Sequence, residues 1–178
     1  MEGNTEVLGM AGLPNYRRII ADSDLDGLCA AAVLKTVNPT AEVIFAHAAL
    51  IRSGAMDSQI DEHTAIVDLP FHENCGLYLD HHLTNRPTKK QEEEFVARGG
   101  VCQWEATPSA ARLAYDLISP FLDLSHLDEI MPIVDDIDSG GISKEDFLAD
   151  GEILQLSRSL SLKHPEHLQH VLESLSNG

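Results

Sequence analysis

The sequence lacks long apolar runs and has few cysteines. No stretch approaches the ~20 apolar residues that cross a bilayer, and the N-terminus has no basic, hydrophobic and small-residue succession typical of a secretory signal. We therefore expect no membrane association and a cytoplasmic protein. Cys29, Cys75 and Cys102 are widely spaced without a C-x-x-C pair, which excludes a disulfide scaffold and a thiolate zinc site and predicts reduced, mainly buried thiols.

Basic residues are also scarce, with 12 Lys and Arg against 29 Asp and Glu and a net charge of −17. We expect no general nucleic-acid surface, because this charge repels polyanions unless metal ions or a further domain draw them in locally. The 178 residues, 43% of them hydrophobic, suffice for one domain with a full-sized core. The sequence leaves open whether the protein forms a homodimer.

The chain is organised around an apolar run that stops at three alternating carboxylates. Residues 19–21 lead into Asp22, Asp24 and Asp26, and residues 28–37 then have the pattern of a helix rich in small residues. Carboxylates this close together repel one another unless a cation lies between them. A hard divalent metal ion is therefore the first inference from this loop.

Two other interpretations of the loop stay open. The spacing also matches the first half of an EF-hand calcium loop, but Val33 stands where that loop needs its bidentate glutamate, and the preceding segment has a strand pattern. In the other interpretation, Asp26 caps the following helix and the remaining aspartates are solvated loop acids.

The order of apolar segments predicts an α/β fold, a mainly parallel sheet flanked by helices, because strand, helix and strand follow one another from the start. We divide the chain into a loose leader at 1–15, a domain at 16–141 and a C-terminal helical extension or linker at 142–178. The expected strands are 16–21, 42–46, 64–67, 76–79 and 101–104. The expected helices are 28–37, 57–61, 89–97, 109–118 and 126–137, the last kinked or restarted at Pro132.

Later strands also end in acidic or imidazole groups. Asp68 follows residues 64–67, and Asp80, His81 and His82 follow residues 76–79. The carboxyl ends of parallel strands meet at one edge, where ligands bind in such sheets, so we expect these groups to join the acidic loop. Such a set of oxygen ligands with imidazole suits Mn²⁺ or Mg²⁺, and two ions can hold a phosphate and activate water. The pattern therefore predicts hydrolysis of phosphodiester or phosphoanhydride bonds.

Together, these motifs resemble those of the N-terminal DHH domain in the DHH phosphoesterase superfamily. That family includes RecJ-type exonucleases, oligonucleotide and cyclic-dinucleotide phosphodiesterases, exopolyphosphatases and family II inorganic pyrophosphatases. The resemblance spans residues 16–141 and rests on motifs that occur in the family's order, with an acidic first position as in RecJ-like proteins. They are Asp22-Ser23-Asp24-Leu25-Asp26-Gly27, Asp68, Asp80-His81-His82 and Asp138-Ser139-Gly140.

The resemblance implies a site with two Mn²⁺ or Mg²⁺ ions bridged by Asp68. Asp68 and His82 would act directly in catalysis, with His82 facing the substrate and stabilising charge on the phosphoryl group, while Asp80 would orient the histidine pair. Asp135, Asp136 and Asp138 are all candidates for the ligand of the fourth motif. We choose Asp138 because Ser-Gly follows it. The implied ligands are Asp22, Asp24 and Asp68 for one ion, and Asp26, Asp68, His81 and Asp138 for the other.

Active relatives usually carry a second domain with a glycine- and histidine-rich motif that grips the substrate. No such motif follows Gly141, so we expect the second domain to be absent, either by truncation or by loss, and activity to be weak. The expected substrate is a small phosphate-rich anion or an oligonucleotide end. The alternative is a catalytically silent DHH-like domain that serves assembly or regulation.

Three histidines near the C-terminus recur at every third position, at His164, His167 and His170. This spacing could place them near one helix face, but no carboxylate-rich cluster accompanies them. We therefore favour a solvated, partly amphipathic helix face over a metal site.

Overall fold

A five-stranded parallel sheet forms the centre of the computed structural model, which describes residues 5–177. The strands lie in the order β2-β1-β3-β4-β5, and every neighbouring pair is parallel. The expected α/β class with a parallel sheet is thereby confirmed. The strands are β1 Arg18–Asp22, β2 Glu42–Ala46, β3 Thr64–Val67, β4 Leu77–Asp80 and β5 Val101–Trp104.

Both faces of the sheet are buried, which explains why its strands are continuously apolar in the sequence. In β1, Ile19 packs into the core on one face and Ile20 into the core on the other. In β4, Leu77 and Leu79 pack on the first face and Tyr78 on the second. This alternation is the two-residue period of a strand.

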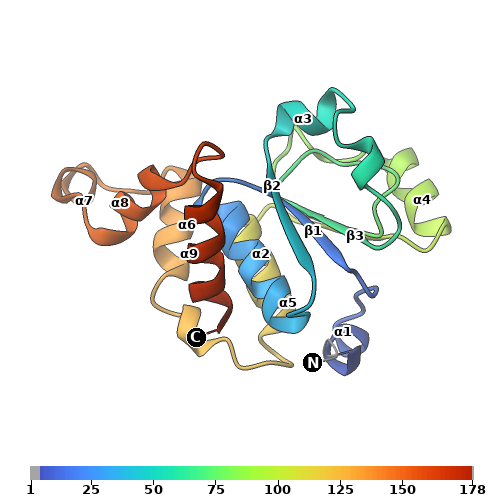
Figure 1. The fold of residues 1–178 in the computed structure, drawn as a ribbon, viewed down its shortest axis with the longest axis horizontal. Helices are drawn as coiled ribbons and strands as arrows, with labels where there is room; N and C mark the ends of the chain where they lie inside the picture. The colour runs from blue at the N-terminus through green and yellow to red at the C-terminus, as the bar shows by residue number, and fades with distance from the viewer. Residues whose placement is uncertain (1–4, 178) are drawn as a thin grey trace.

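Helices cover the two faces unequally (Figure 1). The first face carries α2 Leu25–Val37, α5 Ala110–Ile118, α6 Met131–Ser139 and α9 Pro165–Asn177. The second face carries α3 Ala48–Arg52 and α4 Lys89–Ala97, which contribute Ile51 and Phe95 to its core. Residues 29–34 of α2 are completely buried because that helix lies between the sheet, α5 and α9.

Helix boundaries differ from the sequence prediction where caps and prolines act. The backbone N–H of Gly27 donates to Asp24 Oδ1 at 3.0 Å, so Asp24 is the N-cap and α2 begins at Leu25 rather than at residue 28. The alternative in which Asp26 caps this helix is therefore wrong. A 3₁₀ turn at Ser125–Leu127 precedes α6, and Pro132 lies in the first turn of α6, where proline is tolerated.

The terminal segments contribute to the core. Helix α1, Thr5–Met10, buries Val7 and Leu8, and Leu13 is buried after it, so the expectation of a loose leader is wrong for residues 5–14. Residues 1–4 lie outside the described part. The C-terminal segment is helical as expected, with α7 Lys144–Ala149 and α8 Glu152–Ser159 before α9, and Leu172 of α9 is buried in the main core. The division into domains stays a prediction.

Two further expectations concern thiols and membranes. Cys29 and Cys75 are buried free thiols and Cys102 is a half-buried one, as predicted. Between residues 5 and 177, no helix is both long enough and apolar enough to cross a membrane.

Candidate metal centre

The candidate site lies where the chain changes direction across the sheet. From β1 the chain passes to β2 on one side and then returns to β3 on the other, so the carboxyl ends of β1 and β3 flank a topological switch point. Open parallel sheets bind ligands at such points. Asp22 ends β1, Asp68 follows β3, and Asp80 ends β4.

His81 is surrounded by carboxylates from three segments of the chain. Its Nε2 atom lies 3.0 Å from Asp138 Oδ2, 3.4 Å from Asp26 Oδ2 and 4.0 Å from Asp68 Oδ1. The other ring nitrogen, Nδ1, donates to the carbonyl oxygen of Thr107 at 3.0 Å, because a carbonyl can only accept. In the neutral ring, Nε2 therefore presents its lone pair to the carboxylates.

The buried carboxylate of Asp26 joins the acidic loop to helix α5. It accepts the backbone N–H groups of Ala110 and Ala111 at 2.8 and 2.7 Å, at the helix N-terminus, where negative charge is favourable. Burial and, after it, the charge of Asp138 raise the pKa of Asp26 to about 7, against the opposing effect of the two backbone hydrogen bonds. The carboxyl group of Asp26 can therefore hold either a proton or a metal cation.

Asp68 combines backbone strain with an unsatisfied ligand atom. Its φ angle of 56° lies in the left-handed region, which a non-glycine residue adopts at a cost of about 1–2 kcal/mol. The side chain is buried, and its Oδ1 atom has no hydrogen-bond partner among residues 5–177. Burial raises the pKa of Asp68 well above its usual value, and the charges of Asp26 and Asp24 add to the shift.

Asp80 is by contrast fully engaged in positioning its neighbours. Its Oδ1 atom accepts the backbone N–H groups of His81 and His82 and the Nδ1–H of His82 at 3.0 Å, and its Oδ2 atom accepts the Tyr78 hydroxyl at 2.8 Å. Burial opposes ionisation, but the hydrogen bonds from His82 and Tyr78 hold the pKa of Asp80 below its usual value. The hydrogen bond to Asp80 in turn raises the pKa of His82, whose ring is 43% exposed.

Asp22 and Asp24 stand apart from the tightest groups of ligand atoms. Two groups have all their ligand atoms within 4.8 Å of one another: Asp26, His81 and Asp138 in one, and Asp68, Asp80, His81 and His82 in the other. Asp24 is the exposed N-cap of α2, and Asp22 Oδ1 accepts the backbone N–H of Ser23 at 2.6 Å. Burial and the charge of Asp24 raise the pKa of Asp22.

Only one of the three competing aspartates on α6 reaches the centre. Asp135 Oδ2 accepts Nε–H and Nη2–H of Arg112 at 2.9 and 2.7 Å, and Asp135 Oδ1 accepts the Ser109 hydroxyl at 2.7 Å, so Asp135 joins α6 to α5. Asp136 belongs to neither group of candidate ligands. The geometry therefore favours Asp138, which is 3.0 Å from His81 Nε2.

The residues at this edge fit a divalent cation. Asp68 Oδ1 and His81 Nε2 are the two buried side-chain polar atoms that lack a hydrogen-bond partner in the described chain. Both atoms can ligate a metal, and they lie 4.0 Å apart. Buried carboxylates with raised pKa values gain most from a cation, which would replace the protons that they otherwise retain.

Sequence reasoning missed several groups that support the site. The carbonyl of Thr107 sets the tautomer of His81, and a backbone acceptor has no signature in the sequence. Trp104 Nε1–H donates to the carbonyl of His82 at 3.1 Å. His47 follows β2 and lies 3.5 Å from Asp22 Oδ1. Its place after a strand was a usable signal, because the same rule identified Asp68.

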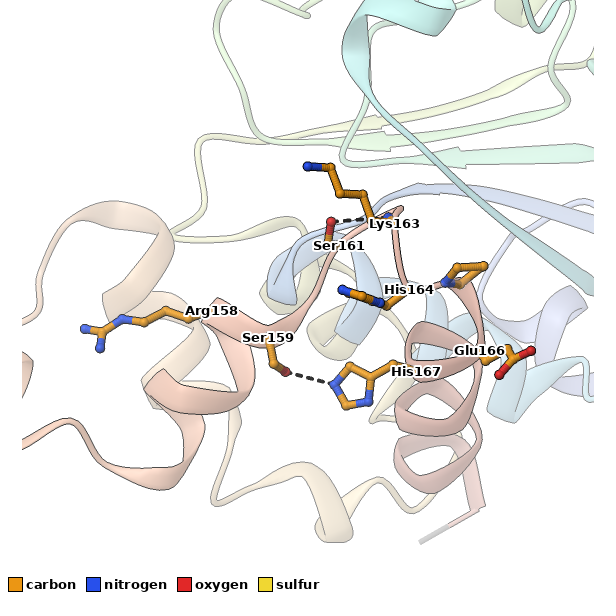
Figure 2. A pocket seen from close by; sticks show the side chains of 8 residues that line it. Arg158, Ser159, Ser161, Lys163, His164, Glu166 and His167 are labelled. Carbon is orange, nitrogen blue, oxygen red and sulfur yellow. Dashed lines mark hydrogen bonds between the residues drawn. The ribbon is translucent and has the colours of Figure 1, made fainter.

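A separate cavity of about 790 Å³ lies between the end of α8 and the start of α9 (Figure 2). His164 and His167 line it, and His167 Nε2 is 2.8 Å from the hydroxyl of Ser159. His164 and His170 are exposed, and neither candidate ligand group contains a histidine of this segment. His167 and His170 belong to α9, but His164 precedes its first residue, Pro165, so the helix-face interpretation does not extend to His164.

The comparisons with known proteins support the fold. No protein-family model matches the sequence, and no curated protein matches it. A solved structure, the pGpG-specific phosphodiesterase PggH from Vibrio cholerae, is similar, with a TM-score of 0.67 and 22% sequence identity. The likeness covers 92% of this chain and 53% of that chain, so this chain spans about half the length of that enzyme. At this identity the likeness establishes a shared fold.

Proposed function

We propose that this chain is a metal-dependent phosphodiesterase domain of the DHH phosphoesterase type. The observation that carries the proposal is the convergence of Asp26, Asp68, His81 and Asp138, from four separate segments, around two buried ligand atoms without hydrogen-bond partners. Two independent features support it. The motifs have the family's order in the sequence, and the similar fold belongs to a protein described as a phosphodiesterase.

The ligand geometry supports one ion between Asp26, His81 and Asp138, and Asp68, whose Oδ1 lies 4.0 Å from His81 Nε2, would be its fourth ligand. A second ion would use Asp22, Asp24 and the other side of Asp68. This is compatible with the charge of Asp24, which raises the pKa of Asp22 after burial and that of Asp68 after burial and Asp26. Mn²⁺ and Mg²⁺ both suit these oxygen-rich ligands. When bound, the ions would polarise the phosphoryl group and lower the pKa of a water molecule.

The protein's own side chains would position and stabilise the reacting phosphate. The Nδ1–H of His82 donates to Asp80, and this hydrogen bond fixes the ring. The other ring nitrogen, Nε2, is then the atom that can contact a substrate. Because Asp80 raises the pKa of His82, the ring is more easily cationic and can stabilise charge on the phosphoryl oxygens. Thr107 fixes His81 in the tautomer that a metal ligand requires.

The proposed substrate is a phosphodiester in a dinucleotide or at an oligonucleotide end. A surface with a net charge of −17 disfavours long polyanions, whereas a short substrate can be held by the ions and a few side chains. Phosphoanhydrides such as polyphosphate and pyrophosphate are the chemically related class that a test must include. We expect weak turnover from this chain.

The test is hydrolysis by the full chain with Mn²⁺ or Mg²⁺. The panel contains pGpG, a cyclic dinucleotide, short oligonucleotides, polyphosphate and pyrophosphate, each also with EDTA. We expect phosphodiester cleavage that EDTA abolishes and that His82→Ala lowers by about 10²- to 10⁴-fold. His164→Ala is the matched control, because it removes an exposed histidine from the separate cavity.

Silence on the entire panel, with Mn²⁺ binding demonstrated by calorimetry, would contradict the enzyme and favour the catalytically silent alternative. Equal losses in His82→Ala and His164→Ala would contradict the role of His82. Absence of Mn²⁺ binding would contradict both the ligand assignment and the mechanism.

A further inference from the structure

The arginines beside the candidate site differ from most others in lacking an acidic partner. Arg17, Arg18, Arg112 and Arg158 each form an ion pair with a carboxylate. Within residues 5–177, no carboxylate ion pair involves Arg52 or Arg86, although acidic residues greatly outnumber basic ones. Both flank the loop that begins at His82.

Arg86 is held beside His82 by an aromatic ring. Its guanidinium carbon lies 4.2 Å from the ring centroid of Trp104, and the indole N–H of Trp104 donates to the carbonyl of His82 at 3.1 Å. A guanidinium that lies over a ring still has its N–H donors in its own plane, free for another acceptor. Arg86 is therefore exposed and held in place by Trp104, and no carboxylate of the described chain forms an ion pair with it.

Arg52 reaches the same loop from helix α3. Its Nη2 atom donates to Asn85 Oδ1 at 2.8 Å. The hydroxyl of Tyr78 lies 3.0 Å from the carbonyl of Asn85 and 2.8 Å from Asp80 Oδ2, so the loop is fixed to the carboxylate that orients the histidines. Arg86 thus lies on, and Arg52 contacts, a loop whose geometry is coupled to His82.

The loop also presents apolar surface. Leu83 directly follows His82 and is 77% exposed, the largest exposed fraction among the exposed large hydrophobic side chains of the described chain. Two guanidinium groups without carboxylate partners, at a loop that also carries an exposed apolar side chain, suit a ligand that combines phosphate with a nucleobase. Inorganic polyphosphate has no part that would use Leu83.

We propose that Arg86 and Arg52 bind a terminal phosphate of a linear dinucleotide whose phosphodiester is placed against His82. The inference rests on the proposed phosphodiesterase function and adds the substrate class. A phosphate outside the metal site would be repelled by the carboxylates there, and these two cations are the local charges that can offset the repulsion. Trp104 is a positioning residue, because it acts on the substrate through Arg86. A cyclic dinucleotide has no terminal phosphate that Arg86 and Arg52 could bind.

The test compares kcat/KM for pGpG with that for GpG, which lacks the terminal phosphate. We expect the full chain with Mn²⁺ to prefer pGpG by about 10- to 100-fold, the range that charge-assisted hydrogen bonds give. Arg86→Ala should remove most of this preference through KM for pGpG, and Arg86→Lys should restore part of it. Trp104→Leu should weaken the preference without abolishing GpG cleavage.

Arg98→Ala is the matched control. Arg98 also lacks a carboxylate partner in the described chain, but it donates to the carbonyl of Glu73 at the opposite edge of the sheet. The preference for pGpG should be unchanged in this variant. Equal kcat/KM for the two dinucleotides, or an equal loss for both in Arg86→Ala, would overturn the inference and leave the proposed function standing. If neither is cleaved, the proposed function fails, and calorimetric binding of pGpG against GpG to the same variants still decides the inference.

Discussion

The metal-free protein should lose stability as the pH rises, and the reason lies at Asp26. Its folded-state pKa is raised from 3.8 to about 7 by burial and by Asp138. Between those two values the folded state retains a proton that the unfolded state releases, so raising the pH favours unfolding. The hydrogen bond from His82 to Asp80 raises the pKa of His82, and this stabilisation is likewise lost as the pH rises above about 6.5.

The magnitude follows from the shift of Asp26. A difference of about three pK units corresponds to about 4 kcal/mol of unfolding free energy, lost between roughly pH 4 and pH 7. Asp80 has the opposite sign, because its pKa is lowered, but its contribution is lost only as the pH falls through about 4. Above that region the slope should therefore be negative.

The measurement is urea unfolding by circular dichroism at a series of pH values in EDTA, repeated with Mn²⁺. Saturating Mn²⁺ should flatten the slope and add about 3 kcal/mol at 100 times its Kd, because the ion replaces the protons. Asp138→Asn should reduce the slope, since the charge of Asp138 is the largest cause after burial. Asp136→Asn, on the same helix, is the control. Constant or rising stability over this range in EDTA, or equal effects of the two variants, would refute the reasoning.

Three further predictions concern single side chains. Asp138→Ala should lower Mn²⁺ affinity at least ~10-fold in calorimetry, and unchanged affinity would remove it from the ligand set. Asp135→Ala removes the acceptor of two hydrogen bonds from Arg112, so urea unfolding should show a loss of about 2 kcal/mol with Mn²⁺ affinity intact; a loss of metal binding alone would reverse the two assignments. Gly27→Ala places a Cβ 2.5 Å from the carbonyl oxygen of Asp22, and should cost about 1–3 kcal/mol by the same assay; wild-type stability would contradict this close approach.

The sheet was predictable because its central strands β1, β3 and β4 are buried on both faces and polar groups follow them at one edge. The strands β2, β3 and β5 have their predicted limits. Helix α1 was missed because it is short and its Val7 and Leu8 become informative only through their burial in the core. The start of α2 was misplaced because residues 25–27 were assigned to the acidic loop, whereas Asp24 caps the helix and α2 begins at Leu25.

The candidate site was predictable as a set of residues and less so as a geometry. Strand ends indicated Asp68, His81 and His82, which the structure brings together. The sequence could not indicate that Asp26 accepts two backbone N–H groups of α5, because that contact joins positions 84 and 85 residues apart. Nor could it separate Asp135 from Asp138, which differ in function only through what each one faces.

The most direct test of the account is the location of Mn²⁺ in a crystal of the protein. Anomalous scattering should give a peak within about 2.5 Å of His81 Nε2 and of a carboxylate oxygen of Asp68, with Asp26 and Asp138 also in contact. A second peak beside Asp68, toward Asp22 and Asp24, would complete the proposed pair of ions. Crystals grown with saturating Mn²⁺ that show no peak among these side chains would contradict the central claim.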